Sequence, residues 1–191
     1  MAYNLQDQEQ IDELKAFWAN NGNRLMWLAV IALAVFAGWR AWNWYHDGQA
    51  QDAAREYAGL VSAADSGKIE QVRERYDAIQ KGYGSSVYAG MAGLRAAEAF
   101  AKANQPDAAV AALENVMKNS TEPGFKPIAG VRLAGLLLDQ KKYGEATKAI
   151  DSGNIGPVSG EMAASVADRR GDILAAQGKA SDAKAAWEEA L

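Results

Sequence analysis

The hydrophobic residues fall into one uninterrupted run near the N-terminus and a long periodic pattern after it. The run LMWLAVIALAVFAGW occupies residues 25 to 39 without a charge. From about Gly48 onward, apolar residues, many of them alanine, recur at helical spacing, and short clusters of Gly, Pro, Ser or Asn interrupt them. The sequence has no strand-like alternation of any length. The pattern therefore predicts an all-α protein, with one apolar helix followed by a series of amphipathic helices.

The apolar run is predicted to cross a membrane. Its uncharged part rises only about 22 Å as a helix, but 20 residues ending at Trp44 span about 30 Å, the thickness of a hydrocarbon core. Arg40 then lies near one interface, where its aliphatic stem lets the charge reach water. We predict a single transmembrane helix at residues 25 to 45. The residues expected at the membrane interfaces are Trp18, Trp27, Trp39, Arg40, Trp42, Trp44 and Tyr45.

The sequence leaves two alternatives open for this run. A buried helix of a soluble core could be equally apolar, although it has little use for tryptophans gathered at both ends. A cleaved signal peptide could use the small residues of Ala32-Leu33-Ala34, although the region before the run is long and contains four carboxylates. Basic residues flank the run almost equally on both sides, so charge bias does not set its orientation.

The residues before the span form a predicted amphipathic tail at residues 1 to 24. The apolar side chains on its one face are Ile11, Leu14, Phe17 and Trp18. This face could lie at the membrane headgroups, contact a partner, or simply lead into the span. The Asn- and Gly-containing residues 20 to 23 then break this amphipathic pattern. The predicted organisation is thus a tail, the span at residues 25 to 45, and a repeat domain at residues 46 to 191.

An internal repeat with a period of 37 residues organises the repeat domain. Its four columns are Ala97, Ala134 and Gly171; Phe100, Leu137 and Leu174; Ala109, Ala146 and Ala183; and Leu113, Ile150 and Trp187. Small residues are needed where paired helices approach closely, and large residues fill the space between units. One further step back gives a degenerate first unit with Leu60, Ala63, Val72 and Tyr76.

Each unit is predicted to contain two helices, which resembles the tetratricopeptide repeat lengthened by about three residues. We expect an α-solenoid with three clear helix-pair units and one degenerate N-terminal unit. The predicted helices occupy residues 48–65, 69–81, 86–103, 106–119, 126–140, 143–151, 160–177 and 180–190. The last pair has no polar capping helix, so Trp187 and Leu191 either form an exposed apolar edge or are buried on their own unit.

The composition argues against most chemistry. Lys plus Arg is 20 and Asp plus Glu is 24, so the net charge of −4 lacks the basic surplus of a nucleic-acid binder. The chain has no cysteine and one histidine, His46, beside the aromatic residues at the end of the span. Acids, bases and nucleophiles do not converge in the sequence. We therefore expect no enzyme, no metal site, no cofactor and no nucleic-acid partner.

A stack of helix pairs forms a superhelix whose concave face is lined by the first helix of each pair. At this register the candidate groove residues are Met91, Leu94, Glu98, Lys102, Ile128, Val131, Leu138, Asp139, Ser165, Asp168 and Asp172. The predicted lining runs from apolar to acidic, which suits a peptide or partner helix with apolar anchors and basic flanks. In the alternative, Leu94, Ile128 and Val131 only pack between neighbouring helices.

The acidic N-terminal stretch, the sequence ELKAFWANNGN at residues 13 to 23, the tryptophan-flanked span and the alanine-rich repeats together resemble the YfgM-type ancillary subunit family of the bacterial SecYEG translocon. The resemblance covers essentially the whole chain, and its most specific part is the stretch before the span. It implies a short cytoplasmic N-terminus, a single inner-membrane span and a periplasmic repeat domain. The partners it implies are SecYEG, the membrane-anchored periplasmic chaperone PpiD, newly exported client proteins and the lipid bilayer.

The sequence therefore favours a membrane-tethered adaptor that helps pass newly exported proteins to periplasmic chaperones. A structural scaffold for cell-envelope assembly or division is the alternative, because related repeat domains occur in periplasmic division coordinators. An uncleaved span with a cytoplasmic tail distinguishes the two, since those coordinators are exported soluble proteins.

Overall fold

The computed structural model describes residues 3 to 191, except for the side chains of residues 3–9, 12, 14, 41 and 43–48. It is 83% helical, and the described residues contain no strand. The chain forms two compact units, Met1–Gly48 and Gln49–Leu191. Helix α1 (Tyr3–Asp65) contributes residues to both units.

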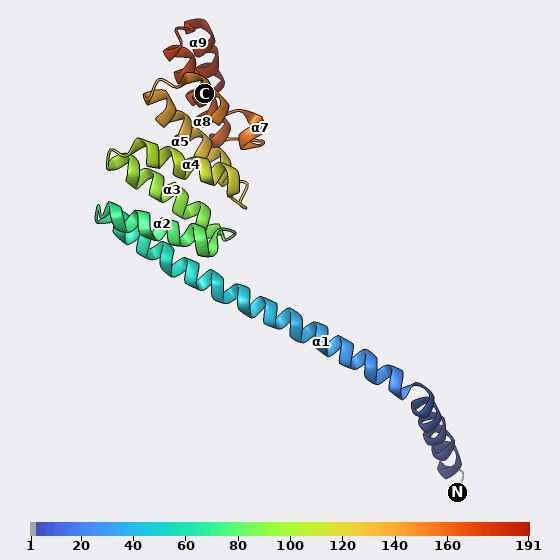
Figure 1. The fold of residues 1–191 in the computed structure, drawn as a ribbon. Coiled ribbons are helices and arrows are strands. Elements are labelled where there is room, and N and C mark those ends of the chain that lie inside the picture. The colour runs from blue at the N-terminus through green and yellow to red at the C-terminus, as the bar shows by residue number, and fades with distance from the viewer. Residues whose placement is uncertain (1–2) are drawn as a thin grey trace. The chain divides into compact units, whose positions relative to one another are not determined.

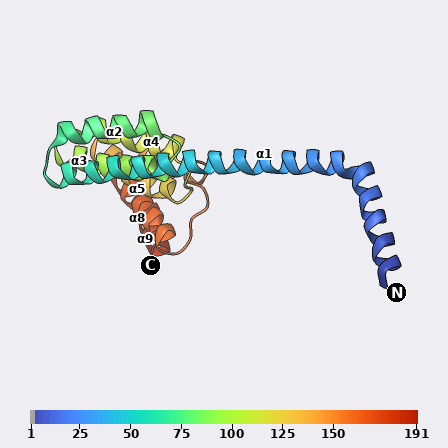
Figure 2. The same cartoon turned by 90° about the horizontal axis from the view of Figure 1, so that it is seen from below.

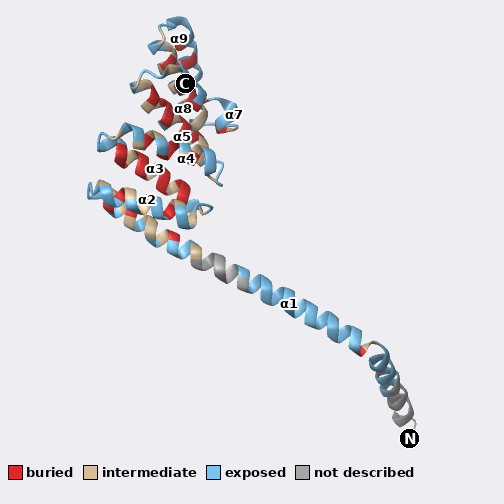
Figure 3. Ribbon diagram, in the orientation of Figure 1, coloured by how far each residue is buried: buried red, intermediate tan, exposed pale blue. Residues whose placement is uncertain are grey.

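In the N-terminal unit, α1 presents its apolar residues to the outside. The segment Lys15–Arg40, 26 residues in length, is long and apolar enough to cross a membrane. Only 6% of its most apolar stretch is buried, and Figure 3 shows this part of α1 as exposed. A helix from the core of a soluble domain would be covered by its own protein, so the structure does not support that alternative.

The helix continues through residues 20 to 23, where the amphipathic pattern of the tail breaks. The indole of Trp18 covers Gly22, so closely that a Cβ atom there would lie 3.2 Å from Trp18 Nε1. The side chain of Asn21 donates a hydrogen bond of 3.3 Å to the carbonyl oxygen of Phe17. These contacts between residues four positions apart favour the helix against the weak propensity of Asn and Gly.

The C-terminal unit is a succession of packed helices (Figure 1). After residues 49 to 65 of α1 come α2 (Ile69–Tyr83), α3 (Val87–Lys102), α4 (Pro106–Asn119), α5 (Phe125–Asp139), α6 (Tyr143–Ala149), α7 (Ser152–Ile155), α8 (Glu161–Ala176) and α9 (Ala180–Glu189). Consecutive helices from α2 to α6 pack in order, α5 also packs against α8, and α8 packs against α9. Figure 2 shows the same succession in a rotated view. The predicted helices are therefore all present.

Helix α7 was not predicted from the sequence. It begins where the carboxylate of Asp151 accepts a hydrogen bond of 2.9 Å from the backbone N–H of Gly153, and it ends with the buried Ile155. A helix of four residues has no apolar periodicity of its own. Its stability comes from the cap at Asp151 and from the packing of Ile155. In the sequence the cap predicts a turn as readily as a helix.

One backbone turn recurs within the helix pairs of the C-terminal unit. The residues with positive φ at this turn are Gly67 (68°), Asn104 (57°), Lys141 (61°) and Gly178 (77°), each 37 positions after the one before. The next residue in each turn donates its N–H to a carbonyl five positions back: Lys68 to Ala63, Gln105 to Phe100, Lys142 to Leu137 and Lys179 to Leu174. This is the Schellman arrangement of a helix C-terminus, and it satisfies carbonyl groups that the helix leaves free.

The core follows the columns of small and large residues. Ten of the twelve column members are buried; the exceptions are Leu174, which is half-buried, and Trp187, which is 39% exposed. Both belong to the last helix pair. The indole of Trp187 lies directly against Gly171, while Leu191 at the end of the chain is fully exposed. The terminal edge therefore combines a packed indole ring with exposed apolar surface.

Candidate functional site

The candidate groove residues lie on three helices that each begin a pair. Those on α3 are Met91, Leu94, Glu98 and Lys102, those on α5 are Ile128, Val131, Leu138 and Asp139, and those on α8 are Ser165, Asp168 and Asp172. The five apolar members are all half-buried. Leu94, Val131 and Leu138 pack against the hydrophobic core. Leu94 and Val131 therefore pack between neighbouring helices, which was the alternative to a role in the groove.

A hollow of about 560 Å³ lies among α3, α4, α5 and α8, and we call it the central hollow. Its charged lining residues are Glu98, Arg132, Asp139 and Arg169, and the remaining surface comes from Ala97, Ala101, Leu113, Gly135 and Leu136. The structure thus brings together two candidate groove residues, Glu98 and Asp139, and two arginines that the sequence analysis did not select. The hollow contains both signs of charge.

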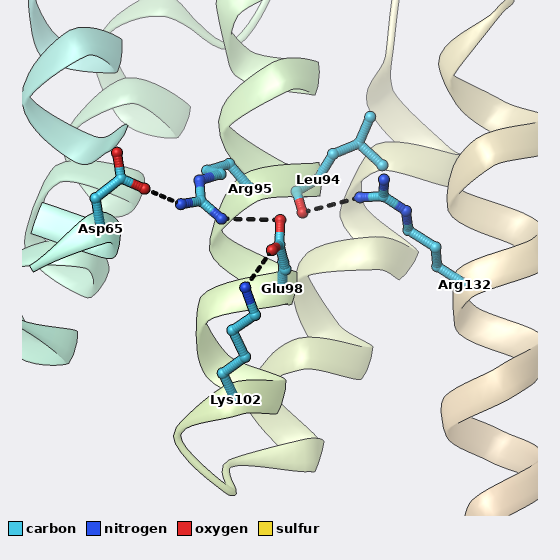
Figure 4. A network of polar contacts seen from close by, with 6 residues as sticks. All are labelled: Asp65, Leu94, Arg95, Glu98, Lys102 and Arg132. Carbon is cyan, nitrogen blue, oxygen red and sulfur yellow. Dashed lines mark hydrogen bonds and ion pairs between the residues drawn. The ribbon is translucent and has the colours of Figure 1, made fainter. Parts of the chain in front are cut away.

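A network of ion pairs surrounds Glu98 on α3 (Figure 4). Arg95 Nη1 lies 2.8 Å and Lys102 Nζ 2.6 Å from its carboxylate oxygens, and Arg95 also pairs with Asp65 at the end of α1. The hydrogen bond from Lys102, with that from Arg95, lowers the pKa of Glu98 although burial acts to raise it. Burial acts to lower the pKa of Arg95, but Glu98 and Asp65 outweigh it and raise this pKa. Both side chains therefore stay charged and neutralise each other.

The arginines that were missed follow the same period as the core columns. Arg95, Arg132 and Arg169 are each 37 residues apart, on α3, α5 and α8. Arg169 Nη1 pairs with Asp172 at 2.9 Å, whereas Arg132 Nη1 donates a long hydrogen bond of 3.5 Å to the carbonyl oxygen of Leu94. Repeating the 37-residue comparison for charged positions would have found this row.

The predicted membrane-interface residues lie along α1. The side chains of Trp18, Trp27, Trp39 and Trp42 are 59% to 65% exposed, and Arg40 is exposed as well. The predictions for Trp44 and Tyr45 fall on side chains outside the described part of the chain. The rings of Phe36 and Trp39 are in contact, with centroids 6.1 Å apart. Large aromatic side chains that their own unit leaves uncovered are suited to a membrane interface.

The fold and the recurring turns define a helical-repeat protein. The family model described as a tetratricopeptide repeat-like domain matches residues 15–191. A protein of Neisseria gonorrhoeae named ancillary SecYEG translocon subunit is 30% identical over 192 residues, covering 100% of this chain and 90% of that protein. A protein of the same name from Escherichia coli is 29% identical over 185 residues, covering 95% and 85%. The chain belongs to the family of ancillary SecYEG translocon subunits.

Proposed function

We propose that this chain is a membrane-anchored adaptor of the bacterial Sec translocon. The observation that carries the proposal is the extent of the relationship, because relatives named as translocon subunits match the chain from the apolar segment through the last repeat. The exposed apolar segment Lys15–Arg40 supports a single inner-membrane span. A subunit of a membrane channel needs such an anchor to stay beside the channel.

In this proposal the chain has three parts. Residues 1 to 24 form a cytoplasmic tail, residues 25 to 45 cross the inner membrane, and residues 46 to 191 form a periplasmic domain. The repeat domain binds partner proteins along the helices that begin each pair, and it helps pass newly exported proteins to a membrane-anchored chaperone of the PpiD type. The helical-repeat architecture supports a binding role rather than an enzymatic one.

Purification from the native membrane tests the proposal. The intact protein is extracted in mild detergent, beside a variant in which residues 25 to 44 are replaced by an unrelated span. We expect translocon subunits and a periplasmic chaperone to accompany the intact protein, and the translocon subunits to be depleted from the variant while its helix content is unchanged. Translocon retained by the variant would place recognition in the repeat domain. Recovery of division or cell-wall proteins without translocon would contradict the proposal and favour a scaffold.

A further inference from the structure

Arg95, Arg132 and Arg169 form a row of arginines, and a row of carboxylates three positions later accompanies it with one member missing. We call the position of the missing carboxylate the gap. Arg95 pairs with Glu98 and Arg169 pairs with Asp172, in both cases with the residue three positions later on the same helix. The equivalent partner of Arg132 would be residue 135, which is Gly135. The middle repeat therefore keeps the arginine and lacks the carboxylate. This gap opens into the central hollow, which both Arg132 and Gly135 line.

The side chains around the gap leave hydrogen-bond donors free. Arg132 is exposed, and among the described residues it forms no ion pair; its guanidinium donates the long hydrogen bond to the carbonyl oxygen of Leu94. The guanidinium of Arg169 lies over Gly135, since a Cβ atom at that position would be 3.6 Å from Arg169 Cζ. Arg169 Nε is buried and has no hydrogen-bond partner in the described part of the chain. Buried donors normally have a partner, so the Arg169 guanidinium has hydrogen-bonding capacity that the described residues leave unused.

The rest of the hollow limits what such a ligand can be. Glu98 is already neutralised by Arg95 and Lys102, so it offers little repulsion to a second carboxylate. Asp139 is exposed and has no ion pair among the described residues, and it lies seven residues after Arg132, about 10.5 Å along α5. Alanine and leucine side chains line the surface between them. A ligand thus meets a positive site, an apolar surface and a negative site in turn.

We propose that the central hollow binds a partner-protein segment in which an acidic and a basic side chain flank apolar residues. The acidic group occupies the place of the missing carboxylate, where Arg132 and Arg169 donate charge-assisted hydrogen bonds. The apolar side chains cover Leu136 and Ala101, and the basic side chain faces Asp139. This inference deepens the proposed adaptor function and rests on it for the idea that the repeat domain binds proteins. Its test uses no translocon, so either idea can fail alone.

Matched synthetic peptides provide the probe. In an extended peptide alternate side chains share one face, so a fluorescent peptide with the core Glu-Leu-Leu-Leu-Lys presents Glu, the middle Leu and Lys to the hollow together. Its charged residues are about 13 Å apart along the backbone, a spacing that the flexible Glu and Lys side chains adapt to the two charged sites. The comparison peptides replace Glu by Gln, Lys by Gln, or Glu by Lys. Fluorescence anisotropy measures their binding to the full-length protein in lipid nanodiscs. We expect the Glu-Leu-Leu-Leu-Lys peptide to bind most tightly, about tenfold more tightly than the peptide in which Gln replaces Glu.

Substitutions at Arg132 and Gly135 test whether the peptide binds at the gap. Arg132→Gln should weaken binding of the Glu peptide about tenfold, to the level of the Gln peptide. Gly135→Glu supplies the missing carboxylate within the chain and should block the peptide, whereas Gly135→Gln, of similar size, should block it much less. Arg170→Gln is the control, because Arg170 pairs with Glu189 and does not line the hollow. Circular dichroism shows that each variant keeps its helix content.

Three results would overturn the proposal. The first is equal binding of the Glu and Gln peptides, or no binding of any peptide. The second is a preference for the peptide with two lysines, which would indicate a partner with basic flanks. The third is an unchanged affinity in both Arg132→Gln and Gly135→Glu. The peptide test and the co-purification test are independent. If the peptides do not bind, the chain can still co-purify with the translocon, and if co-purification fails, the peptides can still bind.

Discussion

At the residue scale, the four equivalent turns differ in how easily their residues adopt positive φ. Gly67 and Gly178 have no Cβ atom and enter this region without a steric cost, whereas Asn104 and Lys141 have one. The left-handed conformation costs a residue with a Cβ atom roughly 1–2 kcal/mol, and asparagine offsets part of this through its short polar side chain. Lysine has no such compensation. Lys141 is therefore the strained member of the set.

We predict that Lys141→Gly stabilises the repeat domain. Relief of the strain exceeds the entropy that glycine loses on folding, so the free energy of unfolding should rise by roughly 0.5–1 kcal/mol. Chemical denaturation of the full chain in detergent, followed by circular dichroism, measures this change. As a control, Lys148→Gly places glycine inside α6, where it should lower stability by about 1 kcal/mol. A decrease in both variants would show that the turn at Lys141 is unstrained.

At the element scale, the close packing of α5 on α6 and α7 depends on Gly130, which has no side chain. A Cβ atom at Gly130 would lie 2.6 Å from the carbonyl oxygen of Ala149 and 2.6 Å from Ile155 Cγ2. The first of these atoms belongs to the backbone of α6 and the second to α7, so neither can easily give way. Glycine at this position lets α5 approach both helices.

Replacing this glycine should force the helices apart. We expect Gly130→Ala to lower the free energy of unfolding by about 1–3 kcal/mol, the range measured for overpacked cores. Gly144→Ala is the matched control, because Gly144 lies in α6 and no atom comes within 4 Å of a Cβ atom there. That variant should be neutral or gain up to about 1 kcal/mol. The same denaturation measurement applies, and equal effects at the two glycines would contradict the close approach.

The sequence predicted those elements that belong to the 37-residue repeat. Helices α2 to α6, α8 and α9 all follow from apolar periodicity, and the buried columns identify the faces that pack. Helix α7 and the continuation through residues 20 to 23 depend on single contacts, such as that between Trp18 and Gly22, which leave no periodic pattern. Apolar periodicity therefore does not predict elements that depend on a single local contact.

The candidate site was predicted less completely than the fold. Periodicity identified the helices that line the central hollow, and two of the candidate residues it selected, Glu98 and Asp139, lie on its surface. It did not show that Leu94 and Val131 pack against the core, since burial of a side chain depends on the distance between helices. The ion pairs of the arginines also depend on that distance.

At the scale of the whole molecule, the proposed orientation in the membrane can be measured directly, since the chain has no native cysteine. Single cysteines are introduced at Gln10 and at the exposed Ser181, and intact cells with a permeable outer membrane are treated with a membrane-impermeant maleimide. We expect Ser181→Cys to be labelled and Gln10→Cys to be labelled only after the inner membrane is opened. The reverse pattern would place the repeat domain in the cytoplasm and contradict the proposed adaptor role.

The recurrence of one turn at Gly67, Asn104, Lys141 and Gly178 also determines how such a chain can change in length. Removing residues 105 to 141, which make up one period, would join the turn at Asn104 to the helix that normally follows the equivalent turn at Lys141. Every later side chain would therefore keep its orientation. Removing one residue fewer would rotate the rest of the following helix by about 100° and turn its apolar face to water. Gain or loss of whole 37-residue modules is thus the change in length that this architecture tolerates during evolution.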